Sequence, residues 1–442
     1  MTDATGSDDF GLFEDTEDEQ TIEMGPESLG GSRQVRSRDS ALDDGLPLLL
    51  MHRERNYHRS LPKIIDQLHK TNAASLSLGL VVNLPRVKPD DAELWLMDSC
   101  AASVRIADPE LYTRPDMWGE VLLQEQYGRP RPDEAPKELM PKTTTPLWDY
   151  WTQTLASGPT EEWVKEVIDS QRQAGANLLL TPGTPLDQYA PGPALDELER
   201  QVSWSRGSIG NGERLAVNIT IDWSWLANPA LRNSLLNMVV ESDEATWYIR
   251  VKWPLQQGAA EPIDASLLDG YRELATFMED EERKLLLPTT GGTGWVSLAW
   301  GACGFGTGIG TGSRGFVTKR PIRRTGPVPP AQPRYYERPI LHTVEKTTAD
   351  SLARVPGYAA CTCTYCLELR DRPTWDGNLH GCHYLLAVGE QTAALAAGPA
   401  RRQVARRMVK AACRKRDEVA SRVLLTGRDA PSHLDLWQER LL

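Results

Sequence analysis

Short apolar runs alternate with amphipathic segments from about residue 45 onward. Apolar runs of four to eight residues between turn residues are typical of buried strands, whereas apolar positions at 3.6-residue spacing predict helices. The predicted strands are 48–51, 76–82, 94–97, 177–180, 215–221, 246–251 and 295–300. The predicted helices are 57–70, 161–174, 193–203, 229–240 and 264–286. Strands that are separated by helices in this way pair in parallel, and the helices form right-handed crossovers between them. This order predicts an α/β fold.

Seven or eight such units indicate a (β/α)₈ TIM-like barrel over residues 45–340. A doubly wound open sheet is the alternative, because periodicity does not distinguish the two architectures. Two Pro-rich stretches, 129–146 and 321–339, predict irregular excursions from the core. In a barrel, reactive residues lie at the C-terminal ends of the strands.

The first 32 residues contain ten acidic residues and no Lys or Arg. Low apolar content and high charge predict a disordered acidic tail over residues 1–44. The simpler interpretation is a solubilising tail. The more specific alternative is an acidic segment that mimics nucleic acid and covers a basic groove. Without these ten acids the chain holds 49 basic and 51 acidic residues, so its charge does not exclude an anionic partner.

Four of the seven cysteines and two of the seven histidines fall between residues 361 and 383. Three thiols within six residues, followed by a histidine, are typical of a tetrahedral Zn²⁺ site. We predict Cys361, Cys363, Cys366 and His383 as the ligands, with Cys382 and His380 as rivals for the fourth position. Disulfides are the alternative. Four protein ligands leave no position for water, so the predicted zinc is structural.

No apolar run approaches the ~20 residues of a membrane helix, and no basic-then-apolar signal opens the chain. These observations predict a cytoplasmic protein without a membrane partner.

The last region, 341–442, is predicted to combine the zinc-binding subdomain with basic helices. A helical pattern from 393 to 425 is interrupted near Gly398 and Pro399, and its second part carries nine basic residues against Asp417 and Glu418. This pattern fits either a docked helix with a solvated basic face or a surface that contacts phosphates.

Two carboxylates are predicted to end strands. Asp98 follows the apolar run 94–97, and Asp222 ends the run 215–221. At a barrel mouth such carboxylates serve as general acids or bases, or accept hydrogen bonds from a base edge. The structural alternative is a helix cap or a loop hydrogen bond. Trp223 and Trp225 next to Asp222 either stack on a planar ligand or pack.

The densest glycine run lies at 301–315 and contains Gly306, Gly308 and Arg314. Glycines let backbone N–H groups approach an anion, and residues 283–336 hold eight basic and no acidic residues, which indicates a phosphate site. The run lacks the Gly-Lys-Ser/Thr ending of a P-loop, so a flexible glycine loop is the alternative.

The Cys361-x-Cys363-x-x-Cys366 motif with the later His383 resembles the zinc site of the tRNA-guanine transglycosylase family, including its archaeosine and DNA-modifying members. This resemblance implies a (β/α)₈ barrel with a zinc subdomain inserted near its end. Asp98-Ser99 resembles the start of the family's Asp-Ser-Gly-Gly-Phe-Gln motif, which implies that Asp98 contacts the exchanged base and that Ser99 lies in the substrate site. The following glycines, the Gly-Gly-Leu-Ala-Val-Gly motif and the nucleophilic Asp have no counterpart.

The resemblance implies a protein that acts on tRNA or DNA and exchanges guanine for a 7-deazaguanine base. Without the usual nucleophile, Asp222 is the substitute candidate. The alternative is a non-catalytic, zinc-stabilised module on a degenerate barrel that binds nucleic acid or protein. A third interpretation is an unrelated barrel enzyme acting on a small phosphorylated substrate. The sequence leaves open whether the chain is catalytic and whether it forms homo- or hetero-oligomers.

Overall fold

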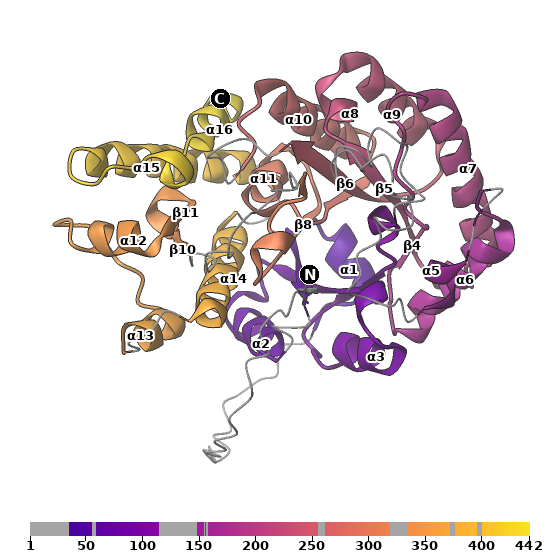
Figure 1. Cartoon of the computed structure of the whole chain (residues 1–442), viewed down its shortest axis with the longest axis horizontal. Coiled ribbons are helices and arrows are strands. Elements are labelled where there is room, and N and C mark those ends of the chain that lie inside the picture. Colours follow the sequence, from indigo (N-terminus) through magenta and orange to yellow (C-terminus); the bar gives the residue numbers. More distant parts are fainter. Residues whose placement is uncertain are drawn as a thin grey trace, which may run out of the picture. The chain divides into compact units, whose positions relative to one another are not determined.

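The computed structural model describes residues 35–54, 59–114, 148–153, 155, 158–254, 261–318, 334–371, 376–395 and 400–442. Within residues 35–442, eight parallel strands form a nearly closed barrel surrounded by helices, so the predicted α/β barrel is confirmed (Figure 1). The strands are β1 (Leu48–Arg53), β2 (Ser77–Asn83), β3 (Val104–Asp108), β4 (Leu179–Leu180), β5 (Leu215–Asp222), β6 (Thr246–Pro254), β7 (Lys284–Leu287) and β8 (Gly304–Gly308). None of the helices in this described part is long and apolar enough to cross a membrane.

Helices alternate with the strands around the barrel. They are α2 (Leu61–Asn72), α3 (Pro89–Met97), α5 (Asp149–Thr152), α6 (Glu161–Gln173), α7 (Pro191–Ser208), α8 (Ser224–Ala227), α9 (Pro229–Glu241), α10 (Ala265–Asp280), α11 (Gly291–Ser297) and α14 (Gly377–Ala394). Their apolar faces share one core with the outward-facing strand residues.

The first and last strands of the barrel pair with each other. β1 hydrogen-bonds to β2 on one side and to β8 on the other, in parallel register. In the strand order β3-β2-β1-β8-β7-β6-β5-β4 every crossover runs in the same direction, which places the helices on one face of the sheet, whereas a doubly wound sheet reverses direction and has helices on both faces. The remaining seam lies between β3 and the short β4. There the Arg105 carbonyl accepts hydrogen bonds from the backbone N–H groups of Asn177 and Leu178 at 3.0 and 3.2 Å.

The Asn177 side chain completes this seam. Its Oδ1 accepts a hydrogen bond from the Arg105 backbone N–H at 2.7 Å, and its Nδ2 donates to the Ser103 carbonyl at 2.9 Å. An amide side chain thus replaces the backbone groups that β4 is too short to provide.

Strands β3, β7 and β8 differ from the predicted elements. Residues 94–97 end helix α3, which starts at Pro89 with Asp90 and Asp91 in its first turn, both favourable at a helix N-terminus. Residues 295–300 lie in α11 and the 3₁₀ turn that follows it. The predicted helix 264–286 ends at Asp280, and its last apolar residues belong to β7. Short apolar runs fit a buried strand and a buried helix equally, which explains these errors.

Helix α1 (Arg38–Asp43) lies within the segment 1–44 that we predicted to be disordered, so the folded part begins earlier than predicted. Ser37 caps the helix, and Ala41 and Leu42 pack into the barrel interior with Leu48 and Leu286. Leu48 is the first residue of β1, so α1 covers the N-terminal end of the barrel. Residues 1–34 lie outside the described part.

The chain between β8 and its barrel helix α14 holds an insertion. It contains the antiparallel hairpin β10 (Arg334–Glu337) and β11 (His342–Glu345), then α12 (Lys346–Ala353) and α13 (Thr364–Asp371). Helix α14 packs against α2 and β8, as the eighth helix of a barrel does, and against α13 and β10 of the insertion. Helices α15 (Ala400–Ala420) and α16 (His433–Arg440) follow (Figure 1).

We predict that Leu42→Ala lowers the free energy of unfolding by about 2–4 kcal/mol, because it leaves a cavity under the barrel. Leu42 is 1% exposed, whereas Asp44 two residues later is exposed. Urea denaturation would measure the change, with Asp44→Ala as the control at less than about 1 kcal/mol. Equal, small effects of both substitutions would show that α1 is not part of the core.

Candidate functional site

The inward-facing side chains change from apolar to polar along the strands. Leu48 and Leu50 of β1, Val104 and Ile106 of β3, and Tyr248 of β6 belong to the interior cluster. Because side chains alternate along a strand, the next inward positions fall at the C-terminal ends. These positions are His52, Asn83, Asp108, Thr220, Asp222, Arg250 and Lys252. This polar layer is the catalytic position of barrel enzymes.

Asp108 and Arg250 form an ion pair in the centre of this layer. Both side chains are 1% exposed. The Asp108 carboxylate also accepts hydrogen bonds from the Tyr248 hydroxyl at 3.2 Å and the Glu110 backbone N–H at 2.9 Å. Burial lowers the pKa of Arg250, but Asp108 together with Tyr112, Tyr248 and Glu110 raises it by more, so the net pKa is raised. The pair remains charged, and its partners compensate the desolvation of both groups.

A second layer of contacts holds this pair in place. The Arg250 guanidinium lies 3.9 Å from the ring centroid of Tyr112, whose hydroxyl donates to Glu110 at 3.0 Å. Asn83 donates to the same Glu110 oxygen at 2.8 Å. Glu110 has φ of 51°, a left-handed conformation that is costly for a residue with a Cβ and is often found at functional sites. His52 is neutral, because burial and the Arg250 charge lower its pKa to about 3.

Asp222 lies at the mouth, where we predicted it. It is the last residue of β5, is 3% exposed and accepts a hydrogen bond from the Ser224 backbone N–H at 3.1 Å. Its register partner on β6 is Lys252, which is 1% exposed. Of the two neighbouring tryptophans, Trp225 is buried against the Leu186 carbonyl, so it packs.

Asp98 does not end a strand, in contrast to our prediction. It is the C-cap of α3, is about half exposed and pairs with Arg53 at 2.8 Å. Arg53 continues the outward register of Leu49 and Met51, so the pair lies outside the barrel. Ser99 follows Asp98 in the connection from α3 to β3. The strand end that we assigned to Asp98 is occupied by Asp108.

The glycine run is a strand, in contrast to the predicted phosphate loop. Gly304–Gly308 is β8, and its backbone pairs with β1 and β7. A Cβ at Gly306 would lie 2.8 Å from His52 Nε2, so glycine lets these strands approach inside the barrel. The loop conformation predicted for Gly306 and Gly308 is therefore wrong, and their role in binding phosphate stays a prediction. Arg314 lies over the Tyr384 ring and donates to the Gly308 and Ile309 carbonyls at 3.3 and 2.6 Å, and its substrate role stays a prediction.

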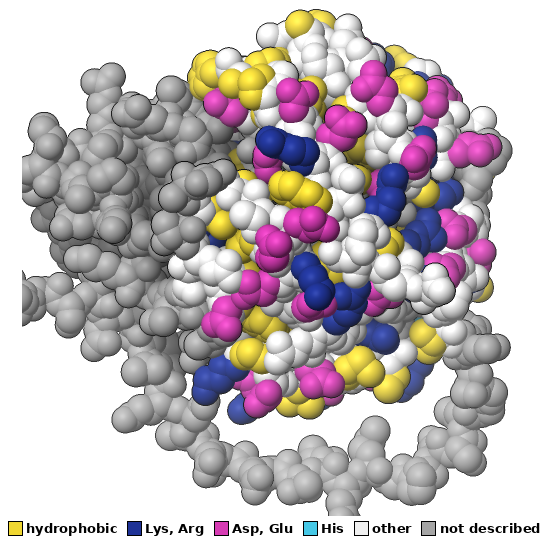
Figure 2. All heavy atoms as spheres, turned by 90° about the vertical axis from the view of Figure 1, so that its right-hand side faces the viewer, with side chains coloured by type: hydrophobic (Ala, Val, Ile, Leu, Met, Phe, Trp, Pro, Cys, Tyr) yellow, Lys and Arg dark blue, Asp and Glu magenta, His cyan; other side chains and the backbone are white. Residues whose placement is uncertain are grey.

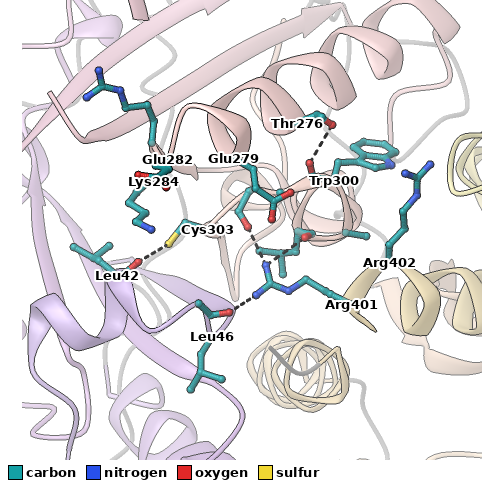
Figure 3. Close-up of a pocket in the computed structure, with 16 residues that line it drawn as sticks. Leu42, Leu46, Thr276, Glu279, Glu282, Lys284, Trp300, Cys303, Arg401 and Arg402 are labelled. Carbon is teal, nitrogen blue, oxygen red and sulfur yellow. Dashed lines mark hydrogen bonds between the residues drawn. The ribbon is translucent and has the colours of Figure 1, made fainter. Parts of the chain in front are cut away.

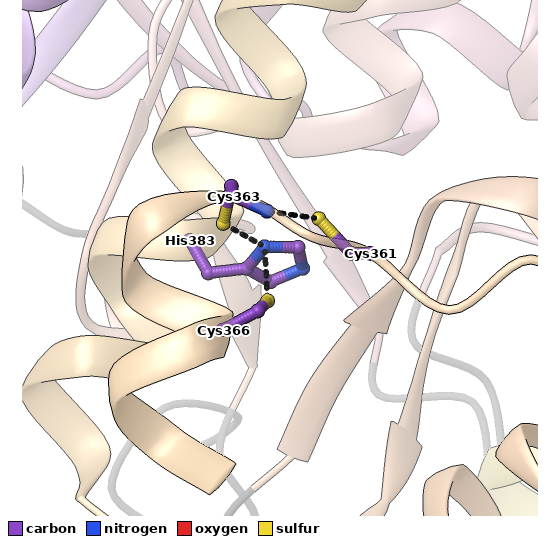
Figure 4. A group of neighbouring side chains, drawn as sticks. All are labelled: Cys361, Cys363, Cys366 and His383. Carbon is purple, nitrogen blue, oxygen red and sulfur yellow. Dashed lines mark hydrogen bonds between the residues drawn. The ribbon is translucent and has the colours of Figure 1, made fainter. Parts of the chain in front are cut away.

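The predicted metal ligands come together as one group. The ligand atoms of Cys361, Cys363, Cys366 and His383 all lie within 4.8 Å of one another (Figure 4). Cys366 is in α13 and His383 in the barrel helix α14, so the group connects the insertion to the barrel. His383 Nε2 bonds to the Tyr336 carbonyl at 2.8 Å, which leaves Nδ1 facing Cys363 and Cys366 at 3.4 and 3.3 Å.

This donor set fits a metal ion. Ligand sulfurs at 2.3 Å from a tetrahedral centre lie about 3.8 Å apart, which is within the 4.8 Å that bounds all separations in this group. The two rivals point elsewhere: His380 Nδ1 faces the Arg334 carbonyl, and the Cys382 thiol donates to Asn378. All seven cysteines are free, so the disulfide alternative is wrong. The cluster could therefore bind a metal ion through the four predicted residues.

Helix α15 presents a basic face to solvent. Arg402, Arg406, Lys410 and Arg414 follow at four-residue intervals with Arg407 beside them, and all five are exposed. None of them forms an ion pair within the described residues, whereas Lys415 and Arg416 pair with carboxylates. The side of the barrel that carries α7 mixes acidic and basic side chains instead (Figure 2). The α15 face is thus a local concentration of unpaired positive charge.

Glu261 lies beside the N-terminus of α11, the helix that follows β7. Its carboxylate accepts hydrogen bonds from the backbone N–H groups of Gly292 and Thr293, both at 3.0 Å, and from the Thr293 hydroxyl at 2.8 Å. Burial raises the pKa of Glu261 to about 7, and these hydrogen bonds offset only part of that rise.

We did not predict four residues of the polar layer, namely Asp108, Arg250, Lys252 and His52. The sequence feature that could have identified them is the alternation of inward and outward residues along each strand. Leu48-x-Leu50-x-His52 and Val104-x-Ile106-x-Asp108 both end on a polar inward position. The signal is usable only once strand bounds are known. Comparisons with protein-family models, curated proteins and solved structures find no match.

We predict that Glu261 makes stability fall as pH rises from 4.5 to about 7. The native carboxyl retains its proton over this range while the unfolded one, with the ordinary pKa of 4.5, has lost it. The full shift corresponds to about 3 kcal/mol. Unfolding free energies of the wild type and Glu261→Gln at pH 5 and pH 8 would test this, because the variant should lose less stability. Parallel pH profiles would contradict it.

Proposed function

We propose that this chain is a zinc-containing barrel of the tRNA-guanine transglycosylase type that acts on nucleic acid in the cytoplasm. The observation that carries the proposal is the Cys361, Cys363, Cys366 and His383 cluster, placed between the insertion after the last strand and the last helix of a (β/α)₈ barrel with buried carboxylates at its mouth. The resemblance in the cysteine motif supports the same reaction type.

Asp222 is the carboxylate best suited to covalent catalysis. It faces inward at the end of β5, and Lys252 lies beside it on β6 in the register. In base exchange its oxygen would attack the ribose anomeric carbon as the outgoing guanine leaves and takes up a proton. The incoming base would then attack the same carbon and release the carboxylate.

Asp108 takes the position at the end of β3 that the resemblance would give to the base-contacting carboxylate. Its oxygens already accept hydrogen bonds from Tyr248 and Glu110 and pair with Arg250. We therefore assign Asp108 and Arg250 a positioning role, in which they hold the polar layer around Asp222.

The exposed basic face of α15 supports a nucleic-acid partner, tRNA or DNA. Arg402, Arg406, Lys410 and Arg414 could each neutralise a phosphate and release counterions. Zinc in the cluster would hold the insertion, and hence α15 beyond it, against the barrel through His383.

A second candidate function is a non-catalytic binding module on a degenerate barrel. It is favoured because the nucleophilic Asp that the resemblance would imply has no counterpart in this chain. The buried Asp108–Arg250 pair also fills part of the mouth with two groups that bind each other.

We predict that the purified chain binds one zinc ion and that Cys363→Ser loses it. A structural zinc is also part of the folding free energy, so this variant and the chelated wild type should both melt at lower temperature. Metal analysis and thermal melting would measure both effects. Cys382→Ser is the matched control, since Cys382 lies on α14 but outside the group, and should retain the metal. Loss of zinc in Cys382→Ser would contradict this ligand set.

We predict that the zinc-loaded chain incorporates labelled guanine or a 7-deazaguanine base into tRNA or DNA. Asp222→Asn should reduce incorporation by about 10³-fold or more, as expected for loss of a nucleophile. Asp98→Asn is the control and should retain activity within about threefold, because Asp98 lies outside the barrel.

No incorporation by the folded, zinc-loaded wild type into either polymer would favour the binding module. Incorporation that survives in Asp222→Asn would remove the role of Asp222 and leave the reaction type intact.

A further inference from the structure

A cavity of about 350 Å³ lies at the N-terminal end of the barrel, opposite the mouth (Figure 3). Its walls come from the connection between α1 and β1, the turn between α10 and β7, the residues before β8 and the first turn of α15. No residue of the polar mouth lines it. The cavity is therefore separate from the site proposed for base exchange.

Hydrogen-bond donors without acceptors line this cavity. The Lys284 ammonium is half-buried, and neither it nor the exposed Arg402 guanidinium has a hydrogen-bond or ion-pair partner within the described residues. The Trp300 side chain is 3% exposed, and its indole N–H also has no acceptor there. A buried donor without an acceptor carries a desolvation cost, which a bound acceptor would remove.

The cavity also has a positive electrostatic potential. Arg401 lies beside Arg402 in the first turn of α15 and donates to the Leu298, Ala302 and Gly45 carbonyls. Two arginines at a helix N-terminus add to the positive end of the helix dipole, an arrangement that an anion stabilises. Arg283 is a fourth basic residue of the lining, and two carboxylates, Glu279 and Glu282, accompany them.

The two carboxylates occupy exposed positions at the opening. Glu279 lies in the last turn of α10 and Glu282 in the connection that follows, with φ of 56°. Neither has an ion-pair partner within the described residues, although basic groups line the same cavity. Unpaired carboxylates at the rim are suited to accept hydrogen bonds from the hydroxyl groups of a ligand.

We propose that this cavity binds a small phosphomonoester that carries hydroxyl groups, of the size of a nucleoside monophosphate. Its phosphate would accept from Arg402 and the Trp300 indole, its hydroxyl groups would donate to Glu279 and Glu282, and Lys284, on the opposite side of the cavity from Arg402, would donate to one of the hydroxyl oxygens (Figure 3). A cavity of this size is within the range of small-molecule sites. The ligand would connect β7 to α15 and thereby stabilise the docking of α15 on the barrel.

Isothermal titration calorimetry on the full, zinc-loaded chain would test this with AMP, inorganic phosphate and adenosine. We expect AMP to bind, phosphate to bind more weakly and adenosine not to bind. Arg402→Ala should weaken AMP binding about tenfold or more, as for loss of a hydrogen bond to a charged group. Arg406→Ala is the matched control, because it lies one turn further on the same exposed face but does not line the cavity.

Lys284→Met gives a second measurement on the barrel side and should weaken binding like Arg402→Ala, with thermal melting as the check on folding. Equal losses in Arg402→Ala and Arg406→Ala would overturn the proposal, since they would indicate diffuse attraction to α15. Absence of binding by AMP and phosphate at millimolar concentration would also overturn it. Neither result depends on whether the mouth exchanges bases.

Discussion

Closure of eight parallel strands around a filled interior is the constraint on which the rest of this structure depends. Every strand must offer small or apolar inward residues near its start, and β1 must reach β8 across the last gap. Glycines at 304, 306 and 308 make that approach possible, since a Cβ at Gly304 would lie 2.9 Å from the Leu48 carbonyl. At the opposite seam, the Asn177 amide joins β3 to the two-residue strand β4.

The same closure concentrates charge at the mouth. Once the lower interior is apolar, polar inward residues can lie only where the strands end, so Asp108, Asp222, Arg250 and Lys252 converge from three strands. Burying such groups costs several kcal/mol per ion unless they are paired and hydrogen-bonded. The Asp108–Arg250 pair satisfies that condition through Tyr248, Thr220 and Glu110. A barrel that retains this arrangement keeps a potential reaction site even where the proposed family's usual nucleophile is missing.

The Cys and His group has a different role, because it joins parts of the chain that the barrel alone does not hold. Cys361, Cys363 and Cys366 belong to the insertion, whereas His383 belongs to the eighth barrel helix. Tyr335 of the hairpin stacks on the His383 ring with centroids 4.5 Å apart, and the Tyr336 carbonyl holds the other ring nitrogen. His383 therefore provides one of the connections between the insertion and the barrel, and helix α15 adds its own through Arg401.

The sequence by itself determined the strand–helix rhythm, the position of Asp222 and the three cysteines of the Cys and His group, with His383 as the preferred fourth member. Each of these depends on local spacing: alternation along a strand, or cysteines close enough to share one centre. Only the tertiary structure decided that residues 94–97 and 295–300 are helical, that the glycine run is β8 and that Asp108 lies at the mouth. A four-residue apolar run and a glycine-rich run have no unique local conformation. Their state is decided by the strands beside which they pack, and Asp108 gains its partner Arg250 from 142 positions away.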